Sequence, residues 1–441
     1  MTGRRAALMA LERFRRSGSW SDAVLDGIVQ KCGMDRREAA LASRLCYGVL
    51  QNMALCDFYI GSYSSVPPKK MEPKVLDILR ISAYQILFLD KIPSRAAVNE
   101  GVKLCKSLGF GRASGLVNAV LRRLSENRDN LPEIPNNDPA DYLSLRYSHP
   151  KWLTEELLRE HGPEFTENFF RANNDEAPMT AQANTLKIDT PSLIKNLEAE
   201  GVAVSAHPWL ENCVLLSGTG DLTELSSFKR GEFYIQDAAA RLAVVAADPK
   251  PGQRVLDACA APGGKSFAAA ILMENSGEII ACDIHKSKLS RIENAARRLE
   301  IDIIYTRACD ARRPDEDLHG SADIVIADVP CSGLGVIRKK PDIRYKNPRE
   351  LAGLPDIQLD ILKGLTPCVK PGGTLIYSTC TVRRQENEGV IEQFLNINTE
   401  FKPEAFKLPG PAGLAESGHI TLWPHIHETD GFFICKLRKK P

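Results

Sequence analysis

Two cysteines stand where strands of this sequence are expected to end. An apolar run over residues 323–328 closes on an aspartate and leads to Pro330 and Cys331, and a second run over residues 372–379 leads to Cys380. The carboxyl ends of parallel strands open onto one crevice, so both thiols are expected to face the same site. One thiolate there can act as a nucleophile, and a second group beside it can transfer a proton.

The loop after residues 254–257 has the pattern of a cofactor site. An apolar strand ends at Asp257, the pair Gly263 and Gly264 permits a tight turn, and a helix of small residues follows. Backbone N–H groups at such a helix start often face a nucleotide-type ligand. Asp283 ends the next apolar run, 20 residues after Gly263, which suits an acid that binds a ribose.

Three cofactors compete for this loop. A dinucleotide site needs G-x-G-x-x-G, which is absent from the loop. A phosphate loop ends in Gly-Lys-Ser, as residues 264–266 do, and residues 324–328 resemble the acidic strand end of nucleotide hydrolases, but Cys259 replaces the first glycine. S-adenosylmethionine has no phosphates and needs a close glycine turn and an acid for its ribose. A turn without any ligand is disfavoured because the turn, the helix start and the acid occur together.

The two cysteines favour S-adenosylmethionine. A phosphate-loop hydrolase has no use for them, whereas methylation of cytosine at C5 needs a thiolate that adds to C6 and makes C5 nucleophilic. The C5 proton must then leave so that the thiol can be eliminated, and a second group can assist this step. Spacing alone does not say which cysteine attacks.

The motifs closely resemble those of RNA 5-methylcytosine methyltransferases of the Sun/Nop2 type. The resemblance rests on Asp257–Lys265, Asp328–Gly333 and Ser378–Thr381, while residues 95–103 and 115–123 are similar to a NusB-like RNA-binding domain. It covers nearly the whole chain and implies an α/β class I S-adenosylmethionine-dependent methyltransferase (Rossmann-like) domain. The implied substrate is a cytosine of 16S rRNA, at the position usually called cytosine 967, in the cytoplasm.

The resemblance also implies roles for single residues. Cys380, of the Thr-Cys pair, is the expected nucleophile, and Cys331 is expected to release the methylated RNA from the opposite side of the base or nearly so. Asp328 would contact the cytosine, while Asp283 would hold the ribose and Asp310 the adenine. Lys265 could merely close the first turn of the helix, but the resemblance favours contact with the target base. The residues expected to bind the cofactor are Cys259, Ala260, Ala261, Pro262, Gly263, Gly264, Lys265, Asp283, Asp310 and Asp328.

Four parts are expected along the chain. Residues 1–130 have helical periodicity and would form the NusB-like domain, and residues 131–141, with three prolines, read as a linker. Residues 142–235 mix helical stretches near 151–160 and 190–200 with short apolar runs, as in a small α+β subdomain that binds RNA. In residues 236–441 strands alternate with helices, which predicts a largely parallel sheet closed by an antiparallel strand at 431–437.

Charge is divided unevenly along the chain. Residues 1–130 hold 21 Lys and Arg against 12 Asp and Glu, and the remainder holds 36 against 44. A basic module joined to an acidic catalytic half suits a protein that docks RNA through one end. The basic run at residues 339–344, close after Cys331, is expected to contact RNA phosphates.

Other classes of protein find little support in the sequence. No run of 18 apolar residues predicts a membrane span, and the N-terminus is too polar for a secretory signal. The 12 cysteines form no C-x-x-C pair and read as reduced thiols, and His425 and His427 lack further ligands, so no metal is expected.

Several alternatives stay open at this point. Within the same chemistry, the target could be a cytosine of tRNA or 23S rRNA, and 16S rRNA could be met free or in an assembling small subunit. From other classes, a phosphate-loop hydrolase and a non-catalytic NusB-like RNA-binding factor remain.

Overall fold

The computed structural model describes residues 1–17 and 22–441, which form two compact units. Unit 1 holds Met1–Asp175 together with Ile337–Pro348, and unit 2 holds Glu176–Val336 and Arg349–Pro441. These two units are coarser than the four parts expected from the sequence, which stay a prediction. Residues 142–175 belong with the N-terminal helices, and a short segment from the catalytic half of the sequence also joins unit 1.

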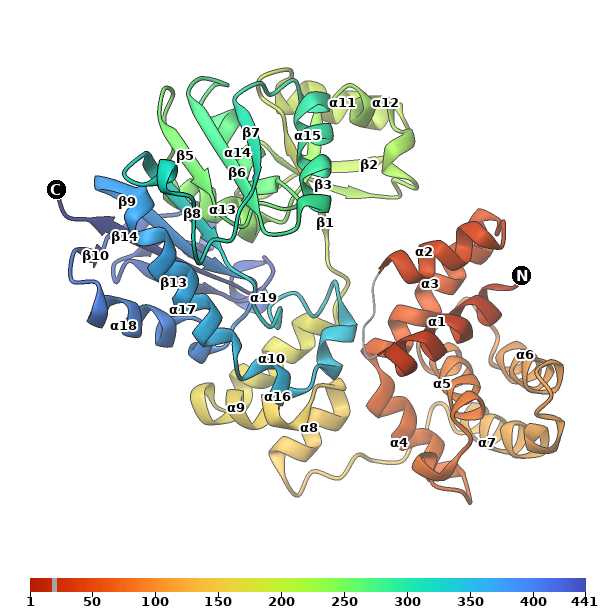
Figure 1. Ribbon diagram of the computed structural model, residues 1–441. Helices are drawn as coiled ribbons and strands as arrows, with labels where there is room; N and C mark the ends of the chain where they lie inside the picture. The colour runs from red at the N-terminus through yellow and green to blue at the C-terminus, as the bar shows by residue number, and fades with distance from the viewer. Residues whose placement is uncertain (18–21) are drawn as a thin grey trace. The chain divides into compact units, whose positions relative to one another are not determined.

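Unit 1 is helical throughout its described residues (Figure 1). Its core includes α5. This helix is buried on most of its sides, because apolar residues occur nearly all the way around it. The helices are α1 (Gly3–Ser17), α2 (Asp22–Lys31), α3 (Arg36–Gln51), α4 (Met53–Tyr63), α5 (Pro73–Phe88), α6 (Ser94–Ser107), α7 (Ser114–Glu126), α8 (Pro139–Tyr147), α9 (Lys151–His161) and α10 (Pro163–Asn174).

The inserted segment, Ile337–Pro348, is anchored in unit 1 by hydrogen bonds from Arg344. This side chain lies in the 3-10 turn Pro341–Tyr345 and is 2% exposed. Its guanidinium donates hydrogen bonds to the ends of α3, α8 and α10, at Gln51 O (2.8 Å), Tyr147 O (2.9 Å), Ser148 O (3.3 Å), Asn173 O (3.2 Å) and Asn174 Oδ1 (2.6 Å). The expectation that residues 339–344 contact RNA phosphates is therefore wrong for Arg344, because protein acceptors surround its charge.

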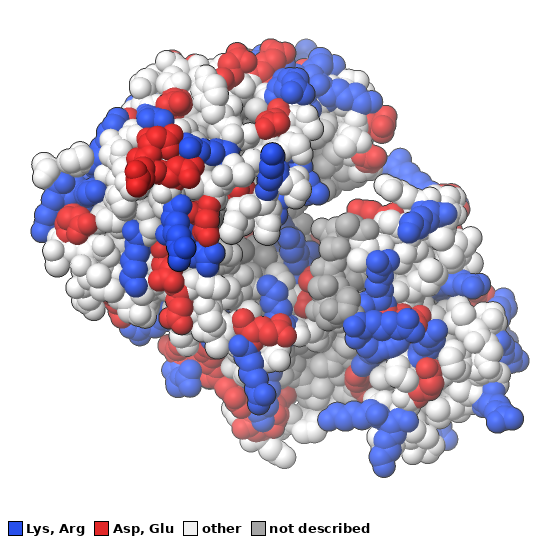
Figure 2. Space-filling view, viewed as in Figure 1, with Lys and Arg blue, Asp and Glu red and all other residues white. Residues whose placement is uncertain are grey.

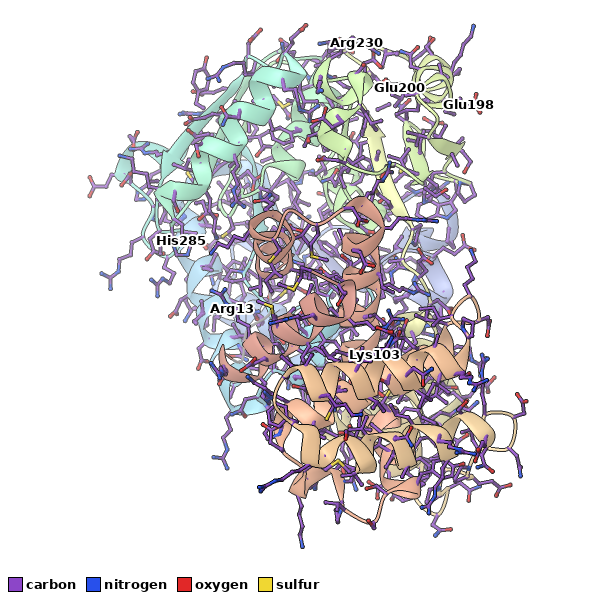
Figure 3. All side chains as sticks on the ribbon, turned by 90° about the vertical axis from the view of Figure 1, so that its right-hand side faces the viewer. Arg13, Lys103, Glu198, Glu200, Arg230 and His285 are labelled. Atoms are coloured by element: carbon purple, nitrogen blue, oxygen red, sulfur yellow. The ribbon has the colours of Figure 1, made fainter. Side chains whose placement is uncertain are left out.

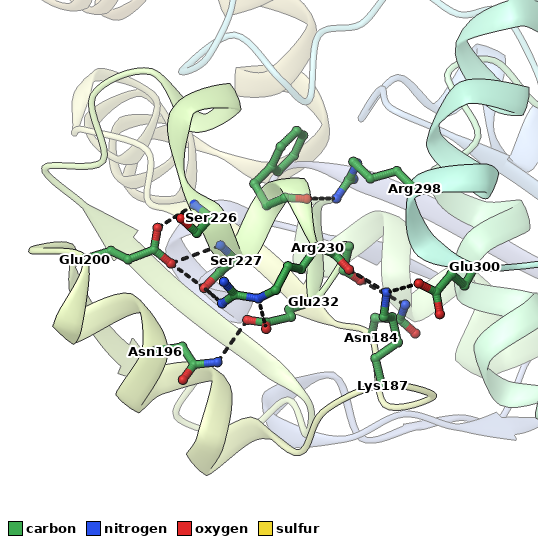
Figure 4. Close-up of polar contacts among 12 residues, drawn as sticks. Asn184, Lys187, Asn196, Glu200, Ser226, Ser227, Arg230, Glu232, Arg298 and Glu300 are labelled. Carbon is green, nitrogen blue, oxygen red and sulfur yellow. Dashed lines mark hydrogen bonds and ion pairs between the residues drawn. The ribbon is translucent and has the colours of Figure 1, made fainter.

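Unit 2 contains a small antiparallel sheet, ordered β2-β3-β1-β4, that is joined to the end of α15 (Lys286–Leu299) (Figure 4). Arg298 donates to the carbonyls of Phe228 (2.6 Å) and Phe233 (3.1 Å), and its guanidinium lies 3.8 Å from the Phe228 ring centre. Asn184 donates to Leu299 O (2.8 Å). The elements are β1 (Met179–Ala183), α11 (Thr190–Ala199), β2 (Ala203–Ala206), β3 (Cys213–Ser217), α12 (Ser226–Lys229) and β4 (Phe233–Ile235).

The large sheet of unit 2 has the order β10-β14-β9-β8-β5-β6-β7, with β13 paired to β14. The strands are β5 (Arg254–Asp257), β6 (Glu278–Asp283), β7 (Ile304–Ala308), β8 (Ala322–Asp328), β9 (Val369–Thr379), β10 (Phe401–Pro403), β13 (His419–Leu422) and β14 (Phe432–Lys439). Strands β5 to β9 pair in parallel, and β14 runs antiparallel to β9. The predicted Rossmann-like fold and its antiparallel last strand are confirmed.

Helices cover both faces of this sheet (Figure 1). One apolar core includes α13, α14 and α15, and a second includes α17 and α18. The chain changes direction between β5 and β8, which is where ligands bind in such sheets. The helices and minor strands are α13 (Ala238–Ala247), α14 (Gly264–Leu272), α15 (Lys286–Leu299), α16 (Pro348–Leu351), α17 (Leu354–Leu365), α18 (Glu388–Ile397), α19 (Pro424–His427), β11 (Phe406–Lys407) and β12 (Leu414–Ala415).

The described residues contain neither a membrane-spanning helix nor a cluster of metal ligands. Among them, no helix combines the length and the apolar character that crossing a membrane requires. No group of three or more His, Cys, Asp or Glu side chains in residues 1–17 and 22–441 lies where it could hold a metal ion.

Candidate active site

The predicted cofactor loop connects β5 to the start of α14. Gly263 has φ +110°, and a Cβ atom there would lie 2.5 Å from the ring of Phe267, so this position needs glycine. Asp257 is completely buried and accepts a hydrogen bond from Ser266 Oγ at 2.6 Å. Burial raises the pKa of the Asp257 carboxyl to about 6. Its hydrogen bond with Ser266 ties the end of β5 to the first turn of α14.

A cavity of about 390 Å³ opens at the carboxyl ends of the strands next to this loop. Its size suits a nucleoside-like ligand. Of the residues expected to bind the cofactor, those that line it are Cys259, Ala261, Asp283, Asp310 and Asp328. The others, Ala260, Pro262, Gly263, Gly264 and Lys265, shape the turn beside it and do not line this cavity.

Two of the lining acids are held in place by neighbouring groups. The Asp283 carboxylate accepts from the backbone N–H of His285 at 2.8 Å, and Lys288 lies 3.7 Å away; His285 is labelled in Figure 3. Arg312 donates to both Asp310 oxygens, at 3.0 and 2.7 Å, and this lowers the pKa of Asp310. Asp310 is therefore a carboxylate at neutral pH.

Two apolar residues in the cavity lining were missed by the sequence analysis. Ile284 is 55% exposed and Ile357 is 39% exposed, although both are large and apolar. Such side chains give flat contact surfaces for a ring. Ile284 could have been found, because it follows Asp283 directly at the end of β6. Ile357 could not, because it lies on α17, far away in the sequence.

Lys265 and Asp328, two residues that were predicted separately to contact the target base, form an ion pair. Lys265 Nζ donates to Asp328 Oδ2 at 2.6 Å, and Ser378 Oγ donates to Oδ1 at 2.8 Å. The Lys265 ammonium also lies 5.2 Å from the Phe432 ring centre. Both carboxylate oxygens of Asp328 are thus engaged, which fixes the direction of the group. Ser378 and Phe432 were not among the predicted site residues.

The two predicted cysteines come together at the ends of the neighbouring parallel strands β8 and β9. Their Sγ atoms are 3.0 Å apart, and both residues are partly exposed. The contact with Cys380, followed by burial, raises the pKa of Cys331 well above its ordinary value. Cys331 therefore keeps its proton in this arrangement.

One expectation about these thiols is wrong. We expected them on opposite sides of the target base, but an aromatic ring needs about 3.5 Å of clearance on each side. A gap of 3.0 Å cannot hold a base. A base can approach the pair only from one side, where it would meet both sulfur atoms.

Comparison with known proteins gives the family. Over 98% of its length the chain is 38% identical to the probable ribosomal RNA small subunit methyltransferase B of Bacillus subtilis, 98% of which is covered. A family described as 16S rRNA methyltransferase RsmB/F matches residues 244–438. The chain belongs to the RsmB/F family. Further matches are to the NusB family over residues 1–126 and to an RsmF/B-like ferredoxin-like domain over residues 149–223.

Two solved structures share the fold of this chain. The crystal structure titled PH0851 is 28% identical, with a TM-score of 0.81 over 99% of this chain and 98% of that one. A methyltransferase homolog protein from Pyrococcus horikoshii is 30% identical, with a TM-score of 0.59, over 69% of this chain and 100% of its own. Membership in the RsmB/F family implies S-adenosylmethionine as methyl donor, and it rules out the phosphate-loop hydrolase and the non-catalytic factor.

The residues of the cavity fit this cofactor. The loop offers a glycine turn and no phosphate cradle, and the cavity joins carboxylates to two exposed isoleucines. A sulfonium nucleoside with ribose hydroxyls needs such a mixture of acceptors and apolar surface.

Proposed function

We propose that this protein transfers a methyl group from S-adenosylmethionine to C5 of a cytosine in 16S rRNA, at the position usually called cytosine 967. The observation that supports this most strongly is the thiol pair. Cys331 and Cys380 lie 3.0 Å apart beside the Lys265–Asp328 ion pair, at the edge of the sheet where the cavity opens. The names of the relatives favour 16S rRNA over tRNA and 23S rRNA.

In this proposal Cys380 is the nucleophile. Its thiolate forms a bond to C6 of the cytosine, and the displaced electron pair makes C5 nucleophilic. The carboxylate of Asp328, fixed by Lys265 and Ser378, faces the base and stabilises the adduct. The base must leave its stack to reach the thiols, so a single-stranded or opened segment is the substrate.

Cys331 acts after the methyl group has arrived. Contact with Cys380 is the largest cause of its raised pKa. Once Cys380 is bound to carbon as a thioether it can no longer be an anion, so Cys331 gives up its own proton to solvent water more easily and becomes a thiolate. Its thiolate can then accept the C5 proton, after which the S–C6 bond breaks and its electron pair returns to Cys380.

The cofactor would be held by the residues of the cavity. Bound S-adenosylmethionine supplies an electrophilic methyl group. Asp283 would accept from the ribose hydroxyls, Asp310 would contact the adenine, and Ile284 and Ile357 would cover its faces. Residues 259–265 would follow the methionine part along the glycine turn.

The basic N-terminal residues would supply affinity for RNA. Residues 1–130 carry 21 Lys and Arg against 12 Asp and Glu, and many of these basic side chains appear on the face of unit 1 drawn in Figure 2. They come from several helices, as Arg13 and Lys103 in Figure 3 illustrate. Such a surface binds phosphates without reading sequence.

Bisulfite sequencing of rRNA from cells with and without the gene tests the target. A 16S rRNA cytosine should be protected only when the gene is present. Protection of a tRNA or 23S rRNA cytosine instead would mean that this RNA, and not 16S rRNA, is the substrate. No change in any RNA would exclude the activity.

Two serine variants test the roles of the cysteines. Cys380→Ser should abolish methylation and any covalent RNA adduct, whereas Cys331→Ser should accumulate an RNA-linked band on a denaturing gel. The control is Cys32→Ser, at a partly exposed cysteine of unit 1, which should behave as wild type. Adducts trapped by Cys380→Ser and lost in Cys331→Ser would reverse the assignment.

A further inference from the structure

A buried carboxylate connects the loops that carry the two cysteines. Glu386 is completely buried at the end of the 3-10 turn Arg384–Glu386, which follows Cys380. Its Oε2 accepts hydrogen bonds from the backbone N–H of Ser332, at 2.8 Å, and from Gln358 Nε2, at 3.1 Å. Arg383 lies 3.6 Å from its other oxygen. Burying a carboxylate is costly unless such partners compensate it.

Gln358 completes a clamp around Cys331. This side chain on α17 is completely buried, and its Nε2 also donates to Pro330 O at 3.0 Å. The carbonyl before Cys331 and the N–H after it are therefore both held, one by Gln358 and the other by Glu386. The backbone on either side of Cys331 has little freedom to turn the thiol away.

The loop of Cys380 has a separate anchor. Thr379 Oγ1 donates to Asn387 Oδ1 at 2.6 Å, and Asn387 Nδ2 donates to Thr381 O at 3.1 Å. Asn387 thus holds the residues on both sides of Cys380. The two loops are joined by Ser332 Oγ and Thr381 Oγ1, which are 2.7 Å apart. Loss of the Glu386 side chain would therefore loosen the backbone at Cys331, while Asn387 would still hold the residues on both sides of Cys380.

We propose that Glu386 is a positioning residue that, with Gln358, holds Cys331 where it can resolve the covalent adduct. This rests on the proposed function and assigns to it a residue that does not touch the substrate. In the resolving step the C5 proton moves to Cys331, the S–C6 bond breaks, and its electron pair returns to Cys380. A displaced Cys331 slows this step and leaves the attack of Cys380 unchanged.

The test compares Glu386→Leu, which removes the acceptor, with Glu386→Gln, which can keep an oxygen toward Ser332. Glu386→Leu should lower methyl transfer about 100-fold and accumulate RNA-linked protein roughly tenfold over wild type. Glu386→Gln should recover most of the activity. The affinity for S-adenosylmethionine should not change in either variant. The control is Glu392→Leu, an exposed carboxylate on α18, which should behave as wild type.

Gln358→Met serves as a second variant if Glu386→Leu does not fold. It removes both bonds from Gln358 and should accumulate the same adduct. Accumulation in Cys331→Ser but not in Glu386→Leu or Gln358→Met would overturn the clamp and leave the proposed function standing. Absence of an adduct even in Cys331→Ser would overturn the proposed function and the clamp together. If both clamp variants fail to fold while Glu386→Gln folds, the role is structural and the proposal is wrong.

Discussion

Asp257 is a buried acid whose ionisation should be visible in the stability of the protein. Burial raises its pKa from 3.8 to about 6. The folded state then binds this proton more tightly than the unfolded chain. The contribution of Asp257 to the free energy of unfolding is therefore present at low pH and is lost as pH rises from about 4 to about 6. Above that range Asp257 is ionised in both states, so it causes no further change of the free energy of unfolding with pH.

Replacing this acid should remove the pH dependence. Asp257→Asn can still accept from Ser266 and has no charge to bury. Relative to wild type, its free energy of unfolding should rise by about 1 kcal/mol between pH 5 and pH 7. Urea denaturation at several pH values measures this, with the exposed Asp302→Asn as control. A constant difference between Asp257→Asn and wild type across this range would contradict the raised pKa.

Sequence motifs identified the residues that lie next to strand ends, and the structure brings several of them together. Lys265 meets Asp328, and Cys331 meets Cys380, because each follows a strand of one parallel sheet. Their chemical roles stay predictions. Glu386, Gln358 and Ile357 could not be found, because they reach the site from segments with no motif of their own. Only the packing of α17 against the sheet reveals them.

At the scale of elements, two loops of unit 2 approach each other too closely for side chains. A Cβ atom on Gly335 would lie 1.8 Å from the carbonyl oxygen of Gly431. Gly335 N–H donates to Cys380 O at 3.0 Å, and Gly431 N–H donates to Gly335 O at 2.8 Å. The loop after β8 is thus fixed against the start of β14 and against Cys380.

A methyl group at position 335 should disturb the loop that carries Cys331. Gly335→Ala should lose methyl transfer by at least about tenfold and destabilise unit 2 by roughly 1–3 kcal/mol, because backbone must move. Activity assays and thermal unfolding measure both effects. Gly353→Ala is the matched control, since a Cβ atom there meets nothing within 4 Å. Equal activity of the two variants would show that the loop can shift without consequence.

The periodicity of the sequence predicted most of the strands in unit 2, but it did not predict how close the sulfur atoms of Cys331 and Cys380 lie. The strands near 254, 278, 323 and 372 and the last antiparallel strand were recognised, because buried strands have apolar runs that end in acids or cysteines. The spacing of the thiols was misjudged. Adjacent strands lie about 4.8 Å apart, so residues that follow paired ends such as Asp328 and Ser378 come close together.

At the scale of the whole molecule, the expected parts followed the order of the chain, and the compact units do not. Residues 337–348 fold with the N-terminal helices although they come directly after the catalytic loop. Local patterns cannot predict such an insertion, because its contacts join residues nearly 300 positions apart, as Arg344 and Gln51 show. The basic residues of this segment suggested contact with RNA because the sequence does not show that protein acceptors surround Arg344.

Arg344 should be important for the stability of unit 1. Its charge lies at the carboxyl ends of α3, α8 and α10, where the helix dipoles are negative, and its guanidinium donates five hydrogen bonds. Burial lowers its pKa to about 10, so it remains charged at neutral pH. Its planar fork reaches acceptors on three helices at once, which a lysine cannot do.

Removing this side chain should therefore loosen three helix ends together. Arg344→Met should lower the free energy of unfolding by about 2–4 kcal/mol, because buried carbonyls lose charged donors, and Arg344→Lys should recover only part of it. Denaturant titration gives the total, and hydrogen exchange should show faster exchange at the ends of α3, α8 and α10. The exposed Arg112→Met, in the same unit, is the control. Unchanged exchange in Arg344→Met would mean that the apolar contacts of the inserted segment alone hold it in unit 1.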